Sequence, residues 1–424
     1  MSAKRTAATA PVLRRITAEA VLQTLMSGDE LTAGDLISAT GLSRPTVHSV
    51  CDELIRRGWV LEKGAAAAPA TAAPGTASSV GLPQDGTAVG TGGRPSRRYS
   101  LHPGAGFVAG VDLGATKISC CLADLRGQIV VESTEPWRDE HVGAPERVLI
   151  ARRILRELLD QAGLDAGKVL AAGMAVPAPV TGGGHAVALE SYLPGMAALD
   201  LRKVLQPDFD WPLLVDNDAN LAVMAERWRG TAMGVDNVVV LLAGERLGAG
   251  ICLGGRLVRG AGAAGEMRFL ELVEGVGNTD AVGGMCRELG AIAAAEVIAG
   301  DRPAPRGGSE LVRLCGRNPE AVTAEMVIKA ARRGDPAAVE VVDVVMERTA
   351  RAAAVVSTLL DPELLVLAGG PAGAGDVLLP VFDRQLGKLN AARPRLAAST
   401  LGDHAALMGA VRAALDHAFE HLLD

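Results

Sequence analysis

Aromatic residues are scarce in this sequence. Phe, Trp and Tyr make up 3% of its 424 residues, although 49% of the chain is hydrophobic. This composition suits helices rich in Ala, Val and Leu packed on sheets, and it argues against a stacking platform for single-stranded nucleic acid. The chain has no run of about 18 uninterrupted apolar residues, and its N-terminus lacks the apolar core of a signal peptide. We therefore expect a cytoplasmic protein without membrane contact.

Paired cysteines and an even spread of charge are also missing. The six cysteines show no Cys-x-x-Cys spacing, which indicates reduced thiols rather than a disulfide framework.

Residues 1–100 hold 11 Lys and Arg against 8 Asp and Glu, whereas the remainder holds 31 against 41. A basic N-terminal head permits an anionic partner there, and the acidic body argues against nucleic acid lying across it. A chain of this length suggests two or three domains.

Helical patterns occupy the first part of the chain. Residues 14–26 carry apolar side chains at near-helical spacing, and Thr32 with Asp35 forms a capping-box pattern at the start of a second helix. Ser43 can cap a third helix that runs to about Arg57. A plain three-helix bundle would show similar spacing. The register of the third helix turns one set of residues inward: Leu42, Val47, Val50 and Leu54.

Two short strand patterns follow the third helix. Residues 58–62 read as a first strand, and residues 92–101 read as a basic hairpin tip with its returning strand. Helix, turn, helix, strand and basic hairpin in this order resemble a winged helix-turn-helix domain over residues 1–101, which implies binding to double-stranded DNA. The residues expected to contact DNA are Ser43, Arg44, Pro45, Thr46, His48, Ser49, Arg94, Arg97 and Arg98.

Between these strands, residues 64–91 are almost wholly Ala, Gly, Pro, Ser and Thr. Such a composition cannot bury enough apolar surface to fold, so we predict a disordered insertion in the wing.

Two polar turns in the body follow buried strands. Asp112, Gly114 and Thr116 form an Asp-x-Gly-x-Thr turn between two strands, where backbone N–H groups can approach a phosphate. The alternative is a hairpin that simply needs glycine.

Asp218 follows the apolar run at residues 213–215, and a carboxylate beyond a strand end can act as a base. The alternative is that Asp216, Asn217 and Asp218 only turn the chain and cap the next helix.

Several motifs then occur in the order found in the ROK family, named for repressors, open reading frames and kinases. They are Asp112-Leu-Gly-Ala-Thr116-Lys117, Val176-Pro-Ala-Pro, Leu193-Pro-Gly, Asp216-Asn-Asp-Ala-Asn220, Gly248-Ala-Gly, Ala264-Gly-Glu266 and Val366-Leu-Ala-Gly-Gly370. The similarity covers about residues 105–415. It implies an α/β, actin-like sugar kinase fold with two ribonuclease-H-like lobes: residues 102–217 with 404–424, and residues 218–403. The head resembles that of the family's transcriptional repressors.

The resemblance also implies roles for individual residues. Asp218 matches the base that deprotonates the sugar hydroxyl, and Asn217 and Glu266 match residues that hold the sugar. Tyr192 stands where the family's sugar loop has Asn, and we include it among the ligand contacts. The first phosphate loop corresponds to Asp112, Gly114, Thr116 and Lys117.

The sequence departs from the kinase pattern at several positions. The second phosphate loop, Gly-Thr-Gly-x-Gly in family kinases, contains Glu245 and Arg246 here, and Arg246 could pair with Glu245. Phe269 replaces the His that contacts sugar and zinc, and only Cys286 remains of a zinc-binding cysteine cluster. We therefore predict no metal and no ATP cofactor, and we regard Asp218 as the remnant of a catalytic base.

Three functions remain open. The first is a DNA-binding regulator, and more specifically a repressor, whose cleft senses a sugar or sugar phosphate without kinase activity. The second is an ATP-dependent sugar kinase with a DNA-binding head. The third is a regulator whose cleft is a relic. A homodimer or homotetramer would suit a helix-turn-helix protein.

We expect limited proteolysis of the free protein to cut first within residues 65–90, because this stretch lacks the apolar residues needed to fold. Mass spectrometry of the early fragments measures the cut positions. Strong protease resistance across the stretch would contradict the predicted insertion.

Overall fold

The computed structural model describes residues 10–26, 28, 30–63, 97–136, 143–181, 195, 199–205, 207–274, 276–278, 280–389 and 393–422. The chain divides into two units. The first, called the head, comprises residues 1–106, 124–128 and 417–424, and the second, called the body, comprises residues 107–123 and 129–416. The predicted wing insertion, Arg94 and Tyr192 lie outside the described residues. Within the part that is described, no helix combines the length and apolar character needed to cross a membrane.

The head contains the predicted helices and wing strands. Its sheet has the order β1-β3-β2, and β3 pairs antiparallel with both neighbours. Its elements are α1 (Ala10–Met26), β1 (Leu31–Thr32), α2 (Ala33–Thr40), α3 (Arg44–Arg56), β2 (Val60–Lys63) and β3 (Arg98–Leu101).

Local hydrogen bonds explain where these helices begin and end. The hydroxyl of Thr32 accepts from the backbone N–H of Asp35 at 3.2 Å, and the Asp35 carboxylate accepts from the N–H of Thr32 at 2.7 Å. This is the predicted capping box. Gly41, with φ of 68°, ends α2 in the left-handed conformation. Ser43 then caps α3, as predicted, by accepting from the N–H of Thr46 at 3.4 Å.

The body contains two five-stranded sheets with the same strand order. The first sheet is β6-β5-β4-β7-β8 and the second is β11-β10-β9-β12-β13. In each, three consecutive strands precede two that pair in parallel, as β4 does with β7 and β7 with β8. This repeat confirms the two lobes of the kinase-like fold. The first-lobe strands are β4 (Phe107–Leu113), β5 (Lys117–Asp124), β6 (Ile129–Pro136), β7 (Val169–Val176) and β8 (Leu213–Asn217).

The second-lobe strands are β9 (Val238–Ala243), β10 (Leu247–Leu253), β11 (Arg256–Leu257), β12 (Leu364–Ala368) and β13 (Arg395–Ala398). The body's α-helices are α4 (Ala144–Ala162), α5 (Leu201–Leu205), α6 (Asp218–Arg229), α7 (Val282–Ala299), α8 (Glu310–Leu314), α9 (Ala324–Arg332), α10 (Pro336–Leu360), α11 (Gly375–Lys388) and α12 (Ala405–His421). Short 3₁₀ turns are η1 (Ala166–Lys168), η2 (Met267–Leu272), η3 (Pro319–Ala321), η4 (Gly370–Ala374) and η5 (Gly402–His404).

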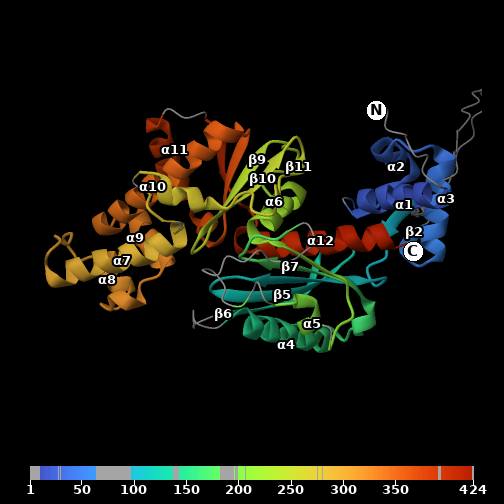
Figure 1. Ribbon diagram of the computed structural model, residues 1–424, viewed down its shortest axis with the longest axis horizontal. Helices are drawn as coiled ribbons and strands as arrows, with labels where there is room; N and C mark the ends of the chain where they lie inside the picture. The colour runs from blue at the N-terminus through green and yellow to red at the C-terminus, as the bar shows by residue number, and fades with distance from the viewer. Residues whose placement is uncertain are drawn as a thin grey trace, which may run out of the picture. The chain divides into compact units, whose positions relative to one another are not determined.

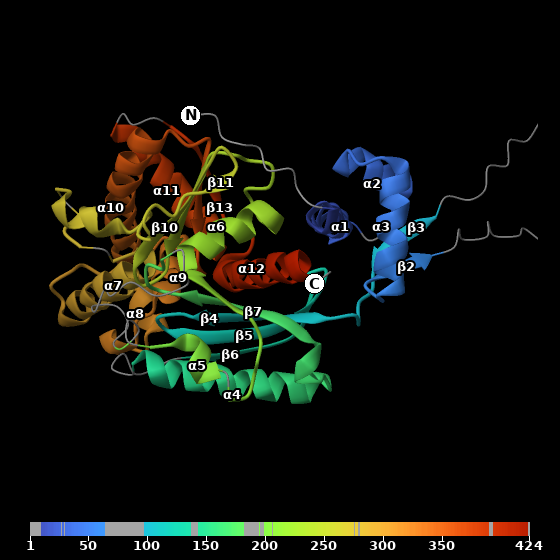
Figure 2. The same cartoon turned by 45° about the vertical axis from the view of Figure 1, so that its right-hand side comes forward.

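Alternating side chains give each sheet two apolar faces. On β9, Val238 and Val240 join a core with α6, whereas Val239 and Leu241 join a larger core with α7, α10 and α11. In the first lobe, α4 covers one face of the sheet with residues such as Ile154. Figures 1 and 2 both show α6 and α12 between the two sheets of the body.

Glycine permits α12 to lie directly on the first sheet. A Cβ atom added to Gly173 on β7 would stand 1.9 Å from the backbone oxygen of Ala410 on α12. No side chain fits that space, so only glycine allows this approach. The C-terminal helix α12 therefore packs directly on the sheet of the first lobe.

Two more glycines bring α12 onto α6 and α6 onto the second sheet. A Cβ on Gly409 of α12 would lie 2.0 Å from the backbone oxygen of Leu221 on α6. A Cβ on Gly250 of β10 would lie 2.0 Å from the backbone oxygen of Ala219. Sheet, helix, helix and sheet are therefore stacked at backbone distance through the centre of the body.

We expect Gly409→Ala to lower the free energy of unfolding by about 1–3 kcal/mol, because the new Cβ overpacks the helix crossing. Alanine is intrinsically a better helix former than glycine by about 1 kcal/mol, so an unconstrained site would gain stability instead. Thermal and urea unfolding measure the change. Gly373→Ala is the control, since nothing lies within 4 Å of the added atom. A Gly409→Ala variant as stable as the wild type would refute the close crossing.

Candidate functional site

The turn from β8 into α6 forms the centre of the site. The side-chain oxygen of Asn217 caps α6 by accepting from the N–H groups of Ala219 at 3.0 Å and Asn220 at 3.2 Å. Its amide group donates to the backbone oxygen of Ala178 at 3.3 Å. Asn217 is thus a helix cap, as the simpler interpretation of this stretch predicts, and a ligand would have to share its amide with Ala178.

Asp216 is fixed by a network beneath this turn. One carboxylate oxygen accepts from the N–H of Asn217 at 2.8 Å and from the side chain of Asn220 at 3.0 Å. The other accepts from two nitrogens of Arg259 at 2.9 and 2.7 Å. Asp216 therefore holds the turn, and it leaves Asp218 as the carboxylate available to a ligand.

Asp218 lies in surroundings that disfavour its charge. Its pKa is raised to about 8. Burial is the largest cause, the nearby charges of Asp112 and Glu266 add to the rise, and a hydrogen bond from the N–H of Ala219 opposes it. Burial likewise raises the pKa of Asp112 to about 7, against the opposing charge of Lys117. Asp112 and Glu266 therefore act electrostatically on Asp218, and the family resemblance assigns the three residues to the phosphate and sugar parts of one cleft. A carboxyl with a pKa near neutrality can exchange a proton with a hydroxyl group.

The first phosphate loop joins β4 to β5. A Cβ on Gly114 would lie 2.9 Å from the backbone oxygen of Lys117, so this tight turn requires glycine. The buried Arg147 of α4 donates to the backbone oxygens of Gly114 at 2.9 Å and Ala115 at 3.4 Å. Thr116 is exposed at the tip of the loop. These contacts orient the turn, and they support both the glycine-requiring hairpin and a former phosphate loop.

Lys117 connects this loop to the segment before α12. Its ammonium group lies 3.0 Å from the Asp403 carboxylate. Asp403 in turn lies close to Gly370, where an added Cβ would stand 2.9 Å from a carboxylate oxygen. The Lys117 charge is therefore paired with an acidic side chain rather than directed at open solvent.

The second loop is occupied by ion pairs of its own. Glu245 pairs with Arg287 at 2.7 Å, and Arg246 lies 3.7 Å from Asp280. The suggested pairing of Arg246 with Glu245 is wrong, because each side chain has a partner on the segment 280–287. The backbone oxygen of Gly244 also accepts from Gly283 N–H at 3.0 Å, which occupies an amide group at the start of α7. A phosphate would meet a carboxylate and filled hydrogen bonds here.

In the head, the predicted DNA contacts divide into exposed and engaged groups. Arg44, Pro45, Ser49 and Arg98 are exposed. The ring of His48 is half-buried, and its Nδ1 lies 3.2 Å from the hydroxyl of the buried Tyr99. Ser43 and Thr46 share a hydrogen bond of 2.8 Å within the cap.

Arg97 is engaged more strongly. Its guanidinium donates to Glu62 at 2.6 Å and to Asp52 at 2.9 Å, and it lies 5.5 Å from the centre of the Tyr99 ring. DNA contact by Arg97 stays a prediction, and it requires these pairs to open.

The sequence model described as "ROK family" matches residues 108–417. The chain belongs to the ROK family. A second model, described as "MarR family", matches residues 18–67 and agrees with the winged helix-turn-helix of the head. The family fold predicted from the sequence is confirmed.

ROK-family relatives include both regulators and kinases. A xylose repressor of Caldicellulosiruptor bescii is 24% identical over 87% of this chain and 86% of its own length. A glucokinase of Halalkalibacterium halodurans is 30% identical over 72% of this chain and 93% of its own. The crystal structure of a ROK family transcriptional regulator, a homolog of the E. coli MLC protein, shares the fold with a TM-score of 0.69 at 21% identity, covering 97% and 98% of the two chains.

Some residues of the ROK site escaped the sequence analysis. Arg259, Asp403, Arg147 and Arg287 all fix a loop of the site, yet each lies far along the chain from its partner. A lone Arg or Asp carries no local pattern, so no sequence signal could have selected them. Among the described residues, no group of three or more His, Cys, Asp or Glu side chains is arranged to hold a metal ion.

We expect Asp218→Asn to stabilise the protein increasingly as pH rises from about 4 to about 8. A carboxyl whose pKa is raised in the folded state binds more protons folded than unfolded, so wild-type stability falls over this window. Asparagine removes that contribution. Melting temperatures of both proteins from pH 5 to pH 9 measure the effect.

The control is Asp376→Asn. A hydrogen bond from Arg332 lowers the pKa of this carboxyl, so the stability it contributes is lost only in acid, as pH falls through the lowered pKa. Its effect should therefore not change with pH between 5 and 9. A constant offset between wild type and Asp218→Asn over the same range would contradict the raised pKa.

Proposed function

We propose that this ROK protein is a DNA-binding transcriptional repressor whose kinase-derived cleft senses a sugar and does not transfer phosphate. The observation that carries the proposal is the pairing of a well-formed winged helix-turn-helix with a second phosphate loop in which Glu245 is fixed by Arg287. The head has the elements needed for operator binding, and the body has an altered phosphate site.

Recognition of DNA would start at the N-terminal end of α3. Arg44 and Ser49 are exposed there, and the recognition helix of helix-turn-helix proteins reads base edges with its N-terminal residues. Ser43 and Thr46 close the helix cap and could bond to phosphate at its edge. A symmetric homodimer or homotetramer would place two such helices on the half-sites of an operator.

The electrostatics of the cleft support loss of kinase activity. Two like charges about 4 Å apart repel by ~1 kcal/mol in water and several-fold more at an effective dielectric of ~20. Arg287 offsets part of the Glu245 charge, and that same pairing keeps the carboxylate within the loop. ATP in the pose of the family's kinases is therefore disfavoured.

The sugar part of the cleft remains. Asp218 and Glu266 are electrostatically coupled, and Asn217 adds an amide at the same turn. These groups can accept and donate hydrogen bonds to sugar hydroxyls without any chemistry. The repressor names of relatives such as the xylose repressor of C. bescii favour a sugar effector. If the effector binds the DNA-binding state and the DNA-free state of the protein with different affinities, its binding would change the affinity for DNA.

The proposal is tested by footprinting on the DNA upstream of the protein's own gene at about 100 mM salt, with and without xylose, glucose and N-acetylglucosamine. We expect a protected site whose affinity one of these sugars changes. Arg44→Ala should weaken binding by about 1–3 kcal/mol. Arg56→Ala, which removes an exposed arginine at the other end of α3, is the matched control and should bind normally.

Two outcomes would contradict the proposal. Absence of specific DNA binding under every condition would refute the repressor role. ATP-dependent phosphorylation of any of these sugars, abolished by Asp218→Asn, would establish the kinase alternative. The 30% identity to a glucokinase is the observation that favours this alternative. If DNA binding is specific but no sugar shifts the melting temperature, the cleft is a relic.

A further inference from the structure

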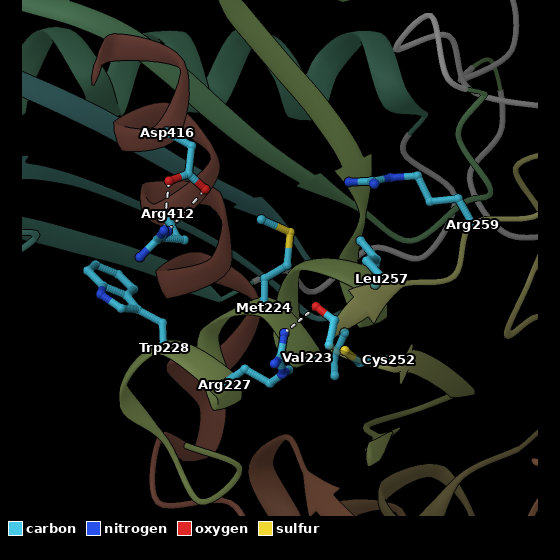
Figure 3. A pocket seen from close by; sticks show the side chains of 10 residues that line it. Val223, Met224, Arg227, Trp228, Cys252, Leu257, Arg259, Arg412 and Asp416 are labelled. Carbon is cyan, nitrogen blue, oxygen red and sulfur yellow. Dashed lines mark hydrogen bonds and ion pairs between the residues drawn. The ribbon is translucent and has the colours of Figure 1, made fainter. Parts of the chain in front are cut away.

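A cavity lies beside α6 and α12 of the body. It has a volume of about 350 Å³, within the range of small-molecule sites, and it is lined by residues of α6, β10, β11, α12 and the segments next to β11. Figure 3 shows Arg227 and Trp228 projecting from α6, and Arg412 and Asp416 from α12. None of the lining residues belongs to the cleft set of Asp112, Asp218 and Glu266. The residues that matter for its chemistry are Met224, Arg227, Trp228, Arg259, Arg412 and Asp416.

Three guanidinium groups line this cavity, and two of them have a nitrogen left for a ligand. Arg227 uses all three of its nitrogens, since it donates to the backbone oxygens of Val235 and Gly255 and to the Asp236 carboxylate. Arg259 uses two nitrogens on Asp216, and 44% of its side chain is exposed. Its third nitrogen has no hydrogen-bond partner among the residues that the structure describes.

Arg412 is held in a similar way on the other helix. It pairs with Asp416 at 2.9 Å through one nitrogen and at 3.0 Å through another, and it lies 5.5 Å from the Trp228 ring centre. The other terminal nitrogen of Arg412 has no hydrogen-bond partner among the described residues, so it can donate to a ligand. Asp416 offers an acceptor for a hydroxyl group, while Arg412 offsets its charge.

The remaining wall is apolar. Val223, Met224, Cys252 and Leu257 supply hydrocarbon and sulfur surface. Trp228 adds part of its ring, and the guanidinium groups of Arg229 and Arg412 lie 4.2 and 5.5 Å from the centre of that ring. Such a surface suits the carbon skeleton of a small ring, whereas guanidinium groups prefer carboxylate or phosphate oxygens.

We propose that this cavity binds a small hydroxylated anion, a sugar phosphate or a sugar acid, as a second ligand separate from the sugar of the cleft. Arg412 and Arg259, which Figure 3 shows on opposite sides of Met224, donate to its anionic group and hydroxyl groups. Asp416 accepts from a hydroxyl, and the ring of the ligand packs beside Met224 and Trp228.

The site is placed to act on the cleft. Its walls come from α6, which packs on the second sheet, and from α12, which packs on the first, so an occupant holds both lobes at one angle. Arg259 also bonds Asp216, which fixes Asn217 at the start of α6. An anion that draws on Arg259 therefore changes the support of the turn that carries Asp218.

The test measures binding of glucose 6-phosphate and of gluconate to the full-length protein, with glucose and with sodium chloride at equal ionic strength as references. Trp228 provides a fluorescence signal, identified by its loss in Trp228→Phe, and melting temperature provides a second readout. We expect one anion to bind and glucose alone to leave the Trp228 signal unchanged. The phosphate and the carboxylate arms distinguish the two kinds of anion.

Variants locate the ligand. Arg259→Gln and Arg412→Gln should each weaken anion binding about tenfold or more, which corresponds to about 1.4 kcal/mol. Arg332→Gln is the matched control, because Arg332 makes an equivalent two-nitrogen pair with Asp376 and 46% of its side chain is exposed. It should leave binding unchanged. If Arg412→Gln does not fold, Arg412→Lys keeps the charge and should still weaken binding.

The inference is overturned if neither anion binds when it is present at about 10 mM. A Kd above that concentration corresponds to a binding free energy too small for a specific site. It is also overturned if Asp218→Asn abolishes binding while Arg259→Gln and Arg412→Gln do not, since the anion would then occupy the cleft. Neither result bears on operator binding, which the footprinting experiment tests separately.

Discussion

The contact of four backbone layers through glycine is the constraint on which the body depends. Gly173 admits α12 to the first sheet, Gly409 admits α6 to α12, and Gly250 admits the second sheet to α6. A side chain at any of these positions would separate layers that now touch, and close-packed interiors tolerate little such change. The two lobes are thus in contact through α6 and α12, and the absence of Cβ atoms sets how closely these helices pack.

This arrangement decides where the chemistry lies. Because α6 is held between α12 and the second sheet, its first residue, Asp218, stays at the point where β8 ends. The charge of Asp112 reaches Asp218 within the first sheet, where β4 and β8 both flank β7, whereas that of Glu266 comes from the second lobe. The loops around this centre are held by ion pairs, such as that of Lys117 in the predicted first phosphate loop with Asp403.

The sequence predicted those features that have local causes. Thr32 and Asp35 form a capping box within four residues, and Asn217 caps the start of α6. Such local patterns predict where helices begin in the head and at the site. The two lobes were predicted from the order of the motifs, which matches that of the ROK family. Pairings across the fold could not be predicted: Arg259 meets Asp216 from 43 residues away, and nothing near either residue signals the partner.

The pairing of Arg246 shows the same limit. Its neighbour Glu245 is the obvious partner in the sequence, yet both residues choose partners on the segment that starts α7. Both residues lie in the turn between β9 and β10, and the backbone of Arg246 makes a bridge with that of Asp280, which brings the other segment within reach.

The ion pairs of Arg97 have a consequence for how tightly the head holds DNA at different salt concentrations. Each phosphate that a cation neutralises steepens the logarithmic salt dependence of binding by about 0.9. Arg97 is already neutralised by Glu62 and Asp52, so its contact with a phosphate would exchange one pairing for another. The wing should therefore release fewer counterions than its count of arginines suggests, and operator binding would depend less steeply on salt.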